Sequence, residues 1–370
     1  MSRILRTLLA LSVVCVVSQA PPPAAAQGPE YPTPEEIEAA ETAPLFTSHE
    51  IVEITLTADF HTMREDDRSD EDSEERPARL EWVDSDGSTG TQEIQIQTRG
   101  NFRLSARNCD FPPLRLNVKT GDAEGTLLHG QDKIKVVSPC KLGQDYWQQY
   151  VFSEYLIYRM YNLLSPLSFR ARLARVTYVD ESGEDDPFTR YAFLLEDDSE
   201  LAKRNGCIKQ DWQGGQLNPV LLDKSQAILV EFFQYMIGNT DFSTYEFHNV
   251  VPARADPPEG SVMPMFYPVP YDFDWSGLVD APYAEPNELL NIRDVKERIY
   301  RGFCWPDMNY SALYAHFQDN REAIMAIWDD LPGVTEDTAK RARQYLEGFY
   351  NTIENEGRRR GNIEAQCRNW

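Results

Sequence analysis

The sequence predicts an α+β protein in which a strand-rich N-terminal lobe is followed by a helix-rich C-terminal lobe. Between residues 49 and 137, several short stretches alternate apolar or β-branched residues with polar ones, as strands with one buried face do. Two long apolar stretches, at 145–164 and 221–239, are typical of buried helices. A chain of 370 residues is long for one hydrophobic core, so we expect two packed lobes, at 49–198 and 199–370.

The N-terminal lobe is predicted to be mostly antiparallel sheet. HEIVEITLTADF forms the first strand, and ARLEWV and TQEIQIQTRGNFR form a hairpin across the turn DSDG, with Ile94 and Ile96 on one face. FPPLRLNVK and DKIKVVSPC form a second hairpin, in which residues whose numbers sum to about 250 lie opposite each other. Because this register places Cys109 opposite Cys140, we predict a disulfide between them.

The remaining elements are one hairpin, two short strands and several helices. The long helix at 145–164 belongs to the first lobe and is followed by the hairpin ARLARVTYVDESGEDDPFTRYAFLLEDD. Asp223 is the expected N-cap of the second long helix, and Gly238 lies just past its end. Short strands around HNVV and PVPYDF follow, and NREAIMAIWDDL and TEDTAKRARQYLEGFYNTI are predicted helices.

The first 26 residues have the pattern of a secretory signal peptide, with Arg3 and Arg6 before an apolar run and small residues near Ala26. We therefore expect a secreted, periplasmic or cell-surface protein, with an extended N-terminal segment at 27–48. Five cysteines follow the leader, and export favours disulfides. Besides the Cys109–Cys140 bridge, we predict that Cys304 and Cys367, which flank the C-terminal helices, form a second one.

The charge of the chain restricts its partners. Without the leader, 34 Lys and Arg stand against 60 Asp and Glu, a formal charge of −26. Such a field repels nucleic acid and anionic membranes. No later segment approaches 18 apolar residues, so stable membrane insertion is not expected. The acidic stretch REDDRSDEDSEERP (64–77) is predicted to be a solvated, disordered loop.

Acidic and amide residues gather around IGNTDFSTYEFHNVV and PVPYDFDWSGLV. Phosphoryl transfer needs a carboxylate that orients the acceptor hydroxyl, oxygen ligands for Mg²⁺, and a lysine on the nucleotide phosphates. Asp241, in the loop after the second long helix, is the candidate orienting carboxylate. Asn249 and Asp272 are candidate metal ligands, and Asp274 is a second ligand or a helper.

The candidate phosphate lysines lie in KIKVV, where Lys133 and Lys135 point the same way and Lys135 lies deeper in the apolar part. Its expected partner is Glu154, which shares a helix face with aromatic residues. A carboxylate in such a place is costly unless a cation pairs with it or it stays neutral.

Each candidate also has an ordinary structural explanation. GNTD after a helix fits a C-cap followed by an Asx turn, and Asp272 and Asp274 would suit a capped loop. Glu154 would then pair with a nearby arginine, Arg159 or Arg170, and His248 is expected to be structural rather than a base. The order of the candidates along the chain favours the functional explanation over these.

Five stretches resemble the CotH-like group of secreted atypical kinases, in the protein-kinase-like superfamily that includes HipA-type kinases. The resemblance covers roughly residues 95–280 and is best in its last two motifs. The stretches are TRGNFR (98–103), FPPLRLNV (111–118), YAFLLEDD (191–198), GNTDFSTYEFHN (238–249) and YDFD (271–274).

The resemblance implies a bilobal, protein-kinase-like fold that binds ATP between its lobes. Asp241 then matches the catalytic-loop aspartate, Asn249 the metal-binding asparagine, and Asp272 the metal-binding aspartate, while Glu196 falls where the chain passes the adenine. Phe111-Pro112-Pro113 replaces the family's lysine-proline, so the phosphate lysine is open between Lys133 and Lys135, and Arg99 would supply part of that contact.

The expected function is an exported phosphotransferase that uses Mg–ATP on a protein or other hydroxyl acceptor. Adenylyl or glutamyl transfer on the same fold is a related possibility. The alternative is a non-catalytic binding or surface-assembly protein. A third candidate is a metal-dependent hydrolase built from Asp241, His248, Asp272 and Asp274.

Overall fold

The computed structural model of the protein describes residues 29–65, 74–100, 102–257, 263–305, 307–329 and 331–369. The predicted leader and most of the predicted acidic loop lie outside these residues. Tyr31–Trp370 forms one unit. None of the helices in the described ranges has the length and apolar character needed to cross a membrane.

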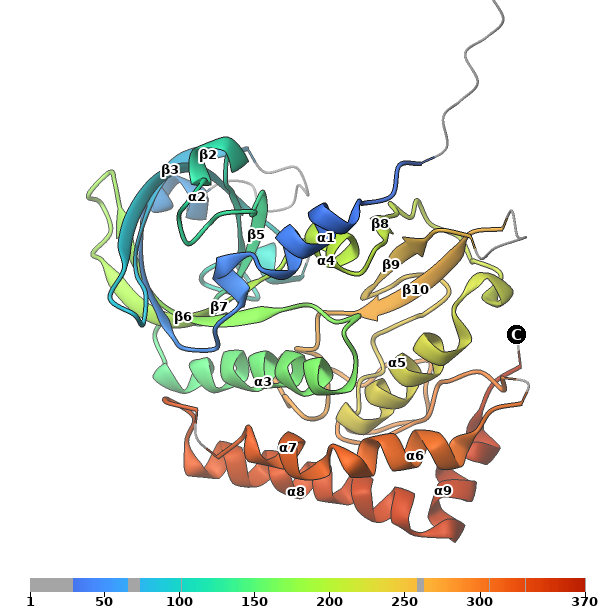
Figure 1. Cartoon of the computed structure of the whole chain (residues 1–370). Coiled ribbons are helices and arrows are strands. Elements are labelled where there is room, and N and C mark those ends of the chain that lie inside the picture. The colour runs from blue at the N-terminus through green and yellow to red at the C-terminus, as the bar shows by residue number, and fades with distance from the viewer. Residues whose placement is uncertain are drawn as a thin grey trace, which may run out of the picture. The chain divides into compact units, whose positions relative to one another are not determined.

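A closed barrel of seven strands dominates the N-terminal half of the described chain (Figure 1). Its order is β1-β2-β3-β4-β5-β7-β6, and its neighbours pair antiparallel except β1 and β6, which run parallel. The strands are β1 (Val52–Ala58), β2 (Arg76–Val83), β3 (Thr89–Thr98), β4 (Leu114–Asn117), β5 (Lys133–Val137), β6 (Ala171–Asp180) and β7 (Phe188–Leu195).

The predicted fold class, a bilobal protein-kinase-like fold, is wrong, because the strands of the N-terminal half form a closed barrel. The antiparallel hairpins were predicted correctly, but the sheet does not stay open. Val52 of β1 lies opposite Ala174 of β6, and this parallel pairing closes the sheet on itself. The inward faces of β1, β2 and β3 then share one core, which includes Leu56, Leu80 and Ile96.

The predicted register of the second hairpin is confirmed. Leu114 of β4 lies opposite Val136 of β5, and Asn117 lies opposite Lys133. The Cys109–Cys140 disulfide forms at the open end of this hairpin, as predicted, with its Cα atoms 4.5 Å apart.

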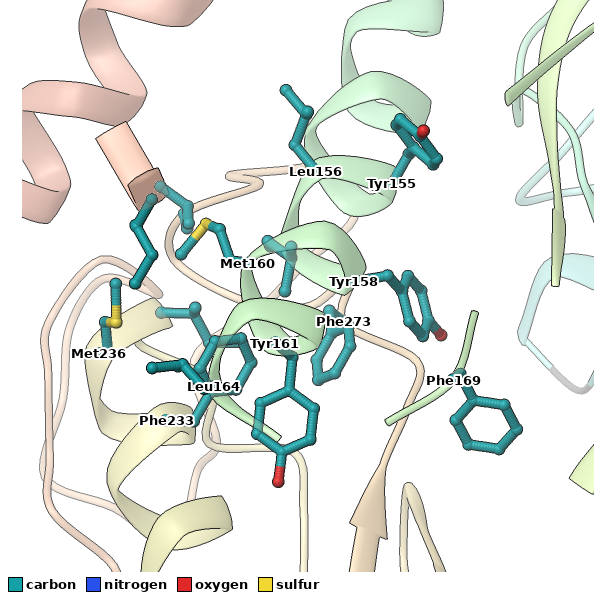
Figure 2. Packing of buried hydrophobic residues seen from close by; sticks show 14 of the residues in the cluster. Tyr155, Leu156, Tyr158, Met160, Tyr161, Leu164, Phe169, Phe233, Met236 and Phe273 are labelled. Carbon is teal, nitrogen blue, oxygen red and sulfur yellow. The ribbon is translucent and has the colours of Figure 1, made fainter. Parts of the chain in front are cut away.

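One long helix lies beneath the barrel, and a second lies beside the first (Figure 1). They are α3 (Gln148–Leu164) and α5 (Lys224–Ile237). Their aromatic side chains interlock, with the rings of Tyr161 and Phe233 4.6 Å apart between centroids, as Figure 2 shows. The caps of α5 are those predicted: the Asp223 side chain accepts from the Gln226 amide, and Gly238 adopts the left-handed conformation.

A small sheet and a layer of C-terminal helices complete the unit. The sheet has the order β10-β9-β8, with β8 (Ile208–Lys209), β9 (Val250–Ala255) and β10 (Met265–Pro270). The C-terminal helices lie on the far side of α3 and α5 from the barrel (Figure 1) and are α6 (Tyr310–Asp319), α7 (Arg321–Ala326), α8 (Glu336–Glu354) and α9 (Glu356–Asn362). The predicted Cys304–Cys367 disulfide is present. Two disulfides are compatible with a secreted protein.

Three short helices were not predicted: α1 (Pro34–Glu41), α2 (Phe60–Glu65) and α4 (Asp198–Arg204). The N-terminal segment at 27–48 was expected to be extended, and α1 corrects this. Thr33 and Glu36 form a capping box at its start, and Pro34 occupies the first helical position. These features start a helix even in a Pro- and Glu-rich segment.

Candidate functional site

Local contacts hold the loop that carries Asp241. The loop follows α5, which ends at Gly238 with a φ of 67°. The Asn239 side chain accepts a hydrogen bond from the Asp241 amide at 2.9 Å, so the predicted Asx turn is present. Arg301 donates to the carbonyls of Thr240 and Phe242, which lie on either side of Asp241. The backbone of Asp241 is therefore held from both sides.

Gly238 brings a second segment next to this loop. A Cβ atom added at Gly238 would lie 1.9 Å from the Tyr345 hydroxyl, so a larger residue would force Tyr345 to move. The amide of Gly277 donates to the Gly238 carbonyl at 3.1 Å, and that of Leu278 donates to the Ile237 carbonyl at 3.0 Å. The end of α5 is thereby joined to the chain that follows Asp272 and Asp274.

Asp241, His248 and Asn249 form a hydrogen-bonded group. His248 Nε2 lies 2.8 Å from Asp241 Oδ1. Asn249 Nδ2 donates to Asp241 Oδ2 at 2.9 Å and to the Asp241 carbonyl at 2.8 Å. The hydrogen bond to Asp241 is the main cause that raises the pKa of His248. His248 thus orients Asp241, and a role for it as a metal ligand through Nε2 would require this bond to break.

Asp272 lies beside this group at the end of β10. The Tyr271 amide donates to the Asn249 carbonyl at 3.1 Å, which places the two segments side by side. Asp272 is exposed, and its amide donates to the Tyr158 hydroxyl at 2.9 Å. Asn249 and Asp272 both have a left-handed backbone, with φ of 50° and 61°. Such conformations cost energy in residues other than glycine and gather at functional sites.

Asp274 is buried behind Asp272, with 6% of its surface exposed. Its Oδ2 accepts a hydrogen bond from the Tyr283 hydroxyl at 2.9 Å. Burial and the charge of Asp272 raise the pKa of Asp274. Between the two acids, Phe273 packs against Tyr158, with ring centroids 4.8 Å apart (Figure 2). The aromatic core thus fixes the segment from which both acids project.

We use the name candidate site for Asp241, His248, Asn249, Asp272 and Asp274. The predicted residues Asp241, Asn249, Asp272 and Asp274 do come together, from two segments of the C-terminal half. The predicted nucleotide-binding residues, which are Lys135, Glu154, Glu196 and Arg99, are not part of this group.

The predicted ion pair between Lys135 and Glu154 is wrong. Lys135 instead forms an ion pair with Asp198 at the start of α4. The pairing of the strands explains this, because Lys135 lies opposite Leu195 of β7 and so meets the acids that follow β7. Its ammonium group also lies 5.0 Å from the ring centroid of Phe169 and 5.4 Å from that of Tyr271. Burial lowers the pKa of Lys135 despite the nearby Asp198.

Glu154 lies on α3 next to the candidate site, and 3% of its surface is exposed. Burial, Asp274 and Asp272 raise its pKa well above the ordinary value, and Arg103 opposes this shift. Arg103, in the short 3₁₀ helix Phe102–Leu104 after β3, lines a small cavity together with Glu154. Arg103 falls within the TRGNFR motif, but this position is visible only in the structure. Tyr283 donates a hydrogen bond to Asp274, and no pattern in the sequence indicated this contact.

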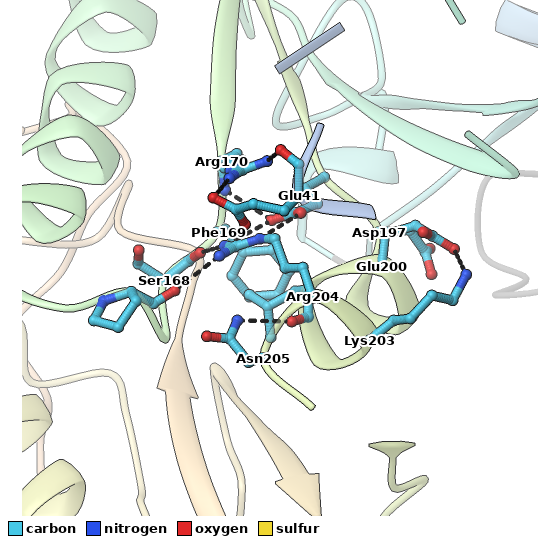
Figure 3. A network of polar contacts seen from close by, with 12 residues as sticks. Glu41, Ser168, Phe169, Arg170, Asp197, Glu200, Lys203, Arg204 and Asn205 are labelled. Atoms are coloured by element: carbon cyan, nitrogen blue, oxygen red, sulfur yellow. Dashed lines mark hydrogen bonds and ion pairs between the residues drawn. The ribbon is translucent and has the colours of Figure 1, made fainter. Parts of the chain in front are cut away.

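Glu196 was predicted to lie beside the adenine of a nucleotide, but its side chain is committed to structural contacts. It is 2% exposed. Arg204 donates to both of its oxygens, at 2.8 and 3.1 Å, and the Arg170 amide donates to it at 3.0 Å. Figure 3 shows the network around Arg170 and Arg204. This network joins β7, α4 and the start of β6, so the Glu196 carboxylate holds the fold together.

Arg99 is half-buried at the end of β3, where its amide donates to the Pro113 carbonyl at 3.0 Å. Its charge helps to lower the pKa of Lys135 and that of Asp198. The charge of Arg99 thus acts on Lys135 and Asp198, and its predicted contact with a phosphate stays a prediction. Tyr271 connects this group to the candidate site, since its ring faces Lys135 and Asp272 follows it in the chain.

A cavity of about 350 Å³ lies beside Gly277, whose amide donates to the Gly238 carbonyl. It is lined by residues of α3, which include Tyr150 and Ser153, by residues of α8, by Gly277–Asp280 and by Lys296. In the described ranges, no group of three or more His, Cys, Asp and Glu side chains is arranged to hold a metal ion. No protein-family model matches the sequence, and no curated protein matches it either.

Proposed function

We propose that this protein is a CotH-like phosphotransferase, which uses Mg–ATP to modify a hydroxyl group on a protein or small-molecule acceptor. One observation carries the proposal: Asp241, Asn249 and Asp272 converge in a fixed geometry from separate segments. Asn249 donates to Asp241 at 2.9 Å, and its carbonyl accepts from the residue before Asp272 at 3.1 Å. Two strained backbone positions support a role beyond packing, because capping alone does not require them.

The residues of the candidate site fit a Mg²⁺ ion bound together with a substrate. Mg²⁺ takes one or two protein oxygens and completes its shell with phosphate and water. Asp272 offers an exposed carboxylate, and Asn249 offers its amide oxygen because its amide nitrogen donates to Asp241. The second oxygen of Asp274 would be a further ligand, since Tyr283 occupies the first. Bound Mg²⁺ would neutralise the charge that develops on the phosphate oxygens.

Asp241 is the residue suited to orient the acceptor. Its side chain is 39% exposed, and His248 and Asn249 hold one carboxylate oxygen each. The acceptor oxygen forms a bond to the terminal phosphorus of ATP as the bond from that phosphorus to the leaving oxygen of ADP breaks. Asp241 takes up the proton of the hydroxyl. Arg99 would supply positive charge on the far side of Tyr271, where Lys135 is paired with Asp198, and the phosphates would extend toward it.

One observation favours a second candidate, a non-catalytic binding protein. Lys135 pairs with Asp198 and Glu196 pairs with Arg204, so two predicted nucleotide ligands are already used inside the fold. A binding protein without catalysis would not need Lys135 or Glu196 to contact a nucleotide, so both ion pairs are compatible with it. Transfer activity decides between the candidates.

The test is transfer from γ-labelled ATP to casein and to the chain itself, followed by mass spectrometry of both products. We expect the mass of one phosphoryl group on an acceptor, and a loss of roughly 10²- to 10⁴-fold in rate for Asp241→Asn. Asp211→Asn, at a carboxylate with 80% of its side chain exposed, is the matched control. Equal rates in Asp241→Asn and the control, or no transfer at all, would contradict the phosphotransferase and favour the binding protein.

A further inference from the structure

We propose that the cavity of about 350 Å³ between α3 and α8 binds a small aromatic carboxylate that carries a hydroxyl group on its ring. The volume lies within the range of about 300–1,000 Å³ that is typical of small-molecule sites. The proposal does not depend on the proposed function, because none of the residues of the candidate site lines this cavity.

Tyrosine rings form much of the cavity wall. Tyr146 and Tyr150, at the start of α3, contact each other edge to face with ring centroids 5.7 Å apart. Tyr345 reaches the cavity from α8. Aromatic rings attract one another in offset or edge-to-face arrangements, so a wall of this kind favours a flat aromatic ligand.

Contacts outside the cavity hold these tyrosines in place. The Tyr345 hydroxyl donates to the Lys296 carbonyl at 3.0 Å, and the Arg298 guanidinium lies 3.7 Å from the centroid of its ring. The Tyr146 hydroxyl accepts a hydrogen bond from Arg341. A wall that is already ordered loses little conformational freedom when a ligand binds, and this favours affinity.

Two buried hydroxyl groups line the cavity and can bond a polar group of the ligand. Ser153 is 4% exposed and Thr338 is 6% exposed. The Ser153 hydroxyl donates to the Gln149 carbonyl at 2.8 Å, so its oxygen can still accept. The Thr338 hydroxyl accepts from that of Thr335 at 2.9 Å and keeps its own proton to donate. One acceptor and one donor suit a phenol hydroxyl, which does both.

The charged residues of the cavity favour an anion. Two cations, Lys296 and Arg341, and one carboxylate, Asp280, line it, although the chain as a whole has a formal charge of −24. Lys296 Nζ lies 3.1 Å from both oxygens of Asp280, and Arg341 lies 3.2 Å from Asp337.

These ion pairs leave both cations able to bind a ligand. The Lys296 and Arg341 side chains are 48% and 55% exposed, and ion pairs between exposed side chains contribute little. Each cation also has further N–H donors, which a ligand carboxylate can use. The ligand carboxylate would therefore lie at Lys296 and Arg341, and its ring hydroxyl at Ser153 and Thr338.

The class of ligand is tested by calorimetric titration of the protein with three probes of similar size. We expect 4-hydroxyphenylacetate to bind at one site, tyramine to bind at least about tenfold more weakly because its charge is reversed, and cyclohexylacetate roughly three- to tenfold more weakly because its ring is not aromatic. No saturable binding of 4-hydroxyphenylacetate would overturn the proposal. Equal binding of tyramine or of cyclohexylacetate would overturn the assigned class.

The place of binding is tested with Arg341→Met, which should weaken 4-hydroxyphenylacetate roughly three- to tenfold. Arg360→Met is the matched control, because Arg360 on α9 also pairs with an acid four residues away, Glu356, at 2.8 Å and does not line the cavity. Both arginines are exposed, so both variants should fold. Equal affinities in Arg341→Met and the control would overturn binding in this cavity.

The orientation is tested by comparing 4-hydroxyphenylacetate with phenylacetate, which lacks the ring hydroxyl. The wild type should prefer the first by roughly two- to tenfold, and Thr338→Val should abolish this preference. Thr352→Val, which removes a hydroxyl of the same helix that donates to the Gly348 carbonyl at 3.0 Å, should keep the preference. A preference that survives in Thr338→Val would overturn the place assigned to the ring hydroxyl.

Discussion

Glu231 provides a prediction about stability that is independent of the candidate site. It lies on α5 with none of its surface exposed. Its Oε2 accepts from Trp305 Nε1 at 3.1 Å and from the Phe303 amide at 3.2 Å, and its Oε1 accepts from the Thr244 hydroxyl at 3.2 Å. Burial outweighs these three hydrogen bonds and raises the pKa of Glu231 to about 7.

The direction of the pH dependence follows from this shift. In the unfolded chain the carboxyl releases its proton near the ordinary 4.5, whereas in the folded chain it keeps the proton up to about 7. The contribution of Glu231 is therefore fully present below 4.5 and is lost as the pH rises to about 7, with no further change above. At about 1.4 kcal/mol for each pH unit, the loss is about 3 kcal/mol.

The perturbation is Glu231→Gln, which keeps the shape but cannot ionise. A glutamine oxygen can accept from Trp305 and Phe303, and its amide can donate to the Thr244 hydroxyl with the hydroxyl reversed. The free energy of unfolding, measured with urea at several values between pH 4.5 and 8, should fall less steeply with pH in the variant, by about 3 kcal/mol in total. Glu322→Gln, at an exposed position of α7, is the control. Parallel profiles for Glu231→Gln and the wild type would refute the reasoning.

Two further predictions concern covalent and steric constraints. Replacing Cys304 and Cys367 by serine opens a loop with a sequence separation of 63. In a denaturant titration, this should lower the free energy of unfolding by about 4 kcal/mol, and a loss under about 1 kcal/mol would contradict the loop-entropy argument. Gly238→Ala should lower the free energy of unfolding by more than about 1 kcal/mol, because φ is 67° and the new Cβ would meet the Tyr345 hydroxyl. Gly143→Ala is the control, since a Cβ at Gly143 meets open space, and equal unfolding midpoints for the two variants would contradict this reasoning.

Local patterns in the sequence were enough to predict the hairpins, their register and the disulfides. Alternation fixed which residues of β3 are buried, and Ile94 and Ile96 do share the core face. Residues 118–132 connect β4 and β5, but the two strands follow each other in the chain, so the register followed from counting, and the Cys109–Cys140 bridge followed from the register. The caps of α5 were predictable because they depend on neighbouring residues alone.

Closure of the barrel could not be predicted in this way. It depends on the parallel pairing of β1 with β6, two strands far apart in the chain whose patterns would suit an open sheet equally well. The contact of Lys135 with Asp198 could not be predicted for the same reason, since it also depends on strand pairing. Alternation showed that Lys133 and Lys135 share a face, but only the pairing with β7 decides that Lys135 meets Asp198 rather than α3.

The candidate site was partly predictable. Asp241 and Asp272 each follow a recognisable helix or strand, and Asn249 directly precedes a strand, so their proximity could be expected from the order of elements. The place of Arg103 near Glu154 could not be expected, because it depends on tertiary packing and not on the order of elements. A loop between β3 and β4, closed by a disulfide, brings Arg103 to α3.

The measurement that tests the central claim most directly is thermal unfolding with and without Mg–ATP in the wild type and in Asp272→Ala. Asp280→Ala is the matched control, since Asp280 is also exposed and left-handed, with a φ of 53°. At a hundred times its dissociation constant, a ligand stabilises the folded protein by about 2.7 kcal/mol, which moves the midpoint measurably. We predict a shift in the wild type and in Asp280→Ala that is lost in Asp272→Ala. The same shift in all three proteins, or none in any, would contradict a metal-dependent nucleotide site at Asp272.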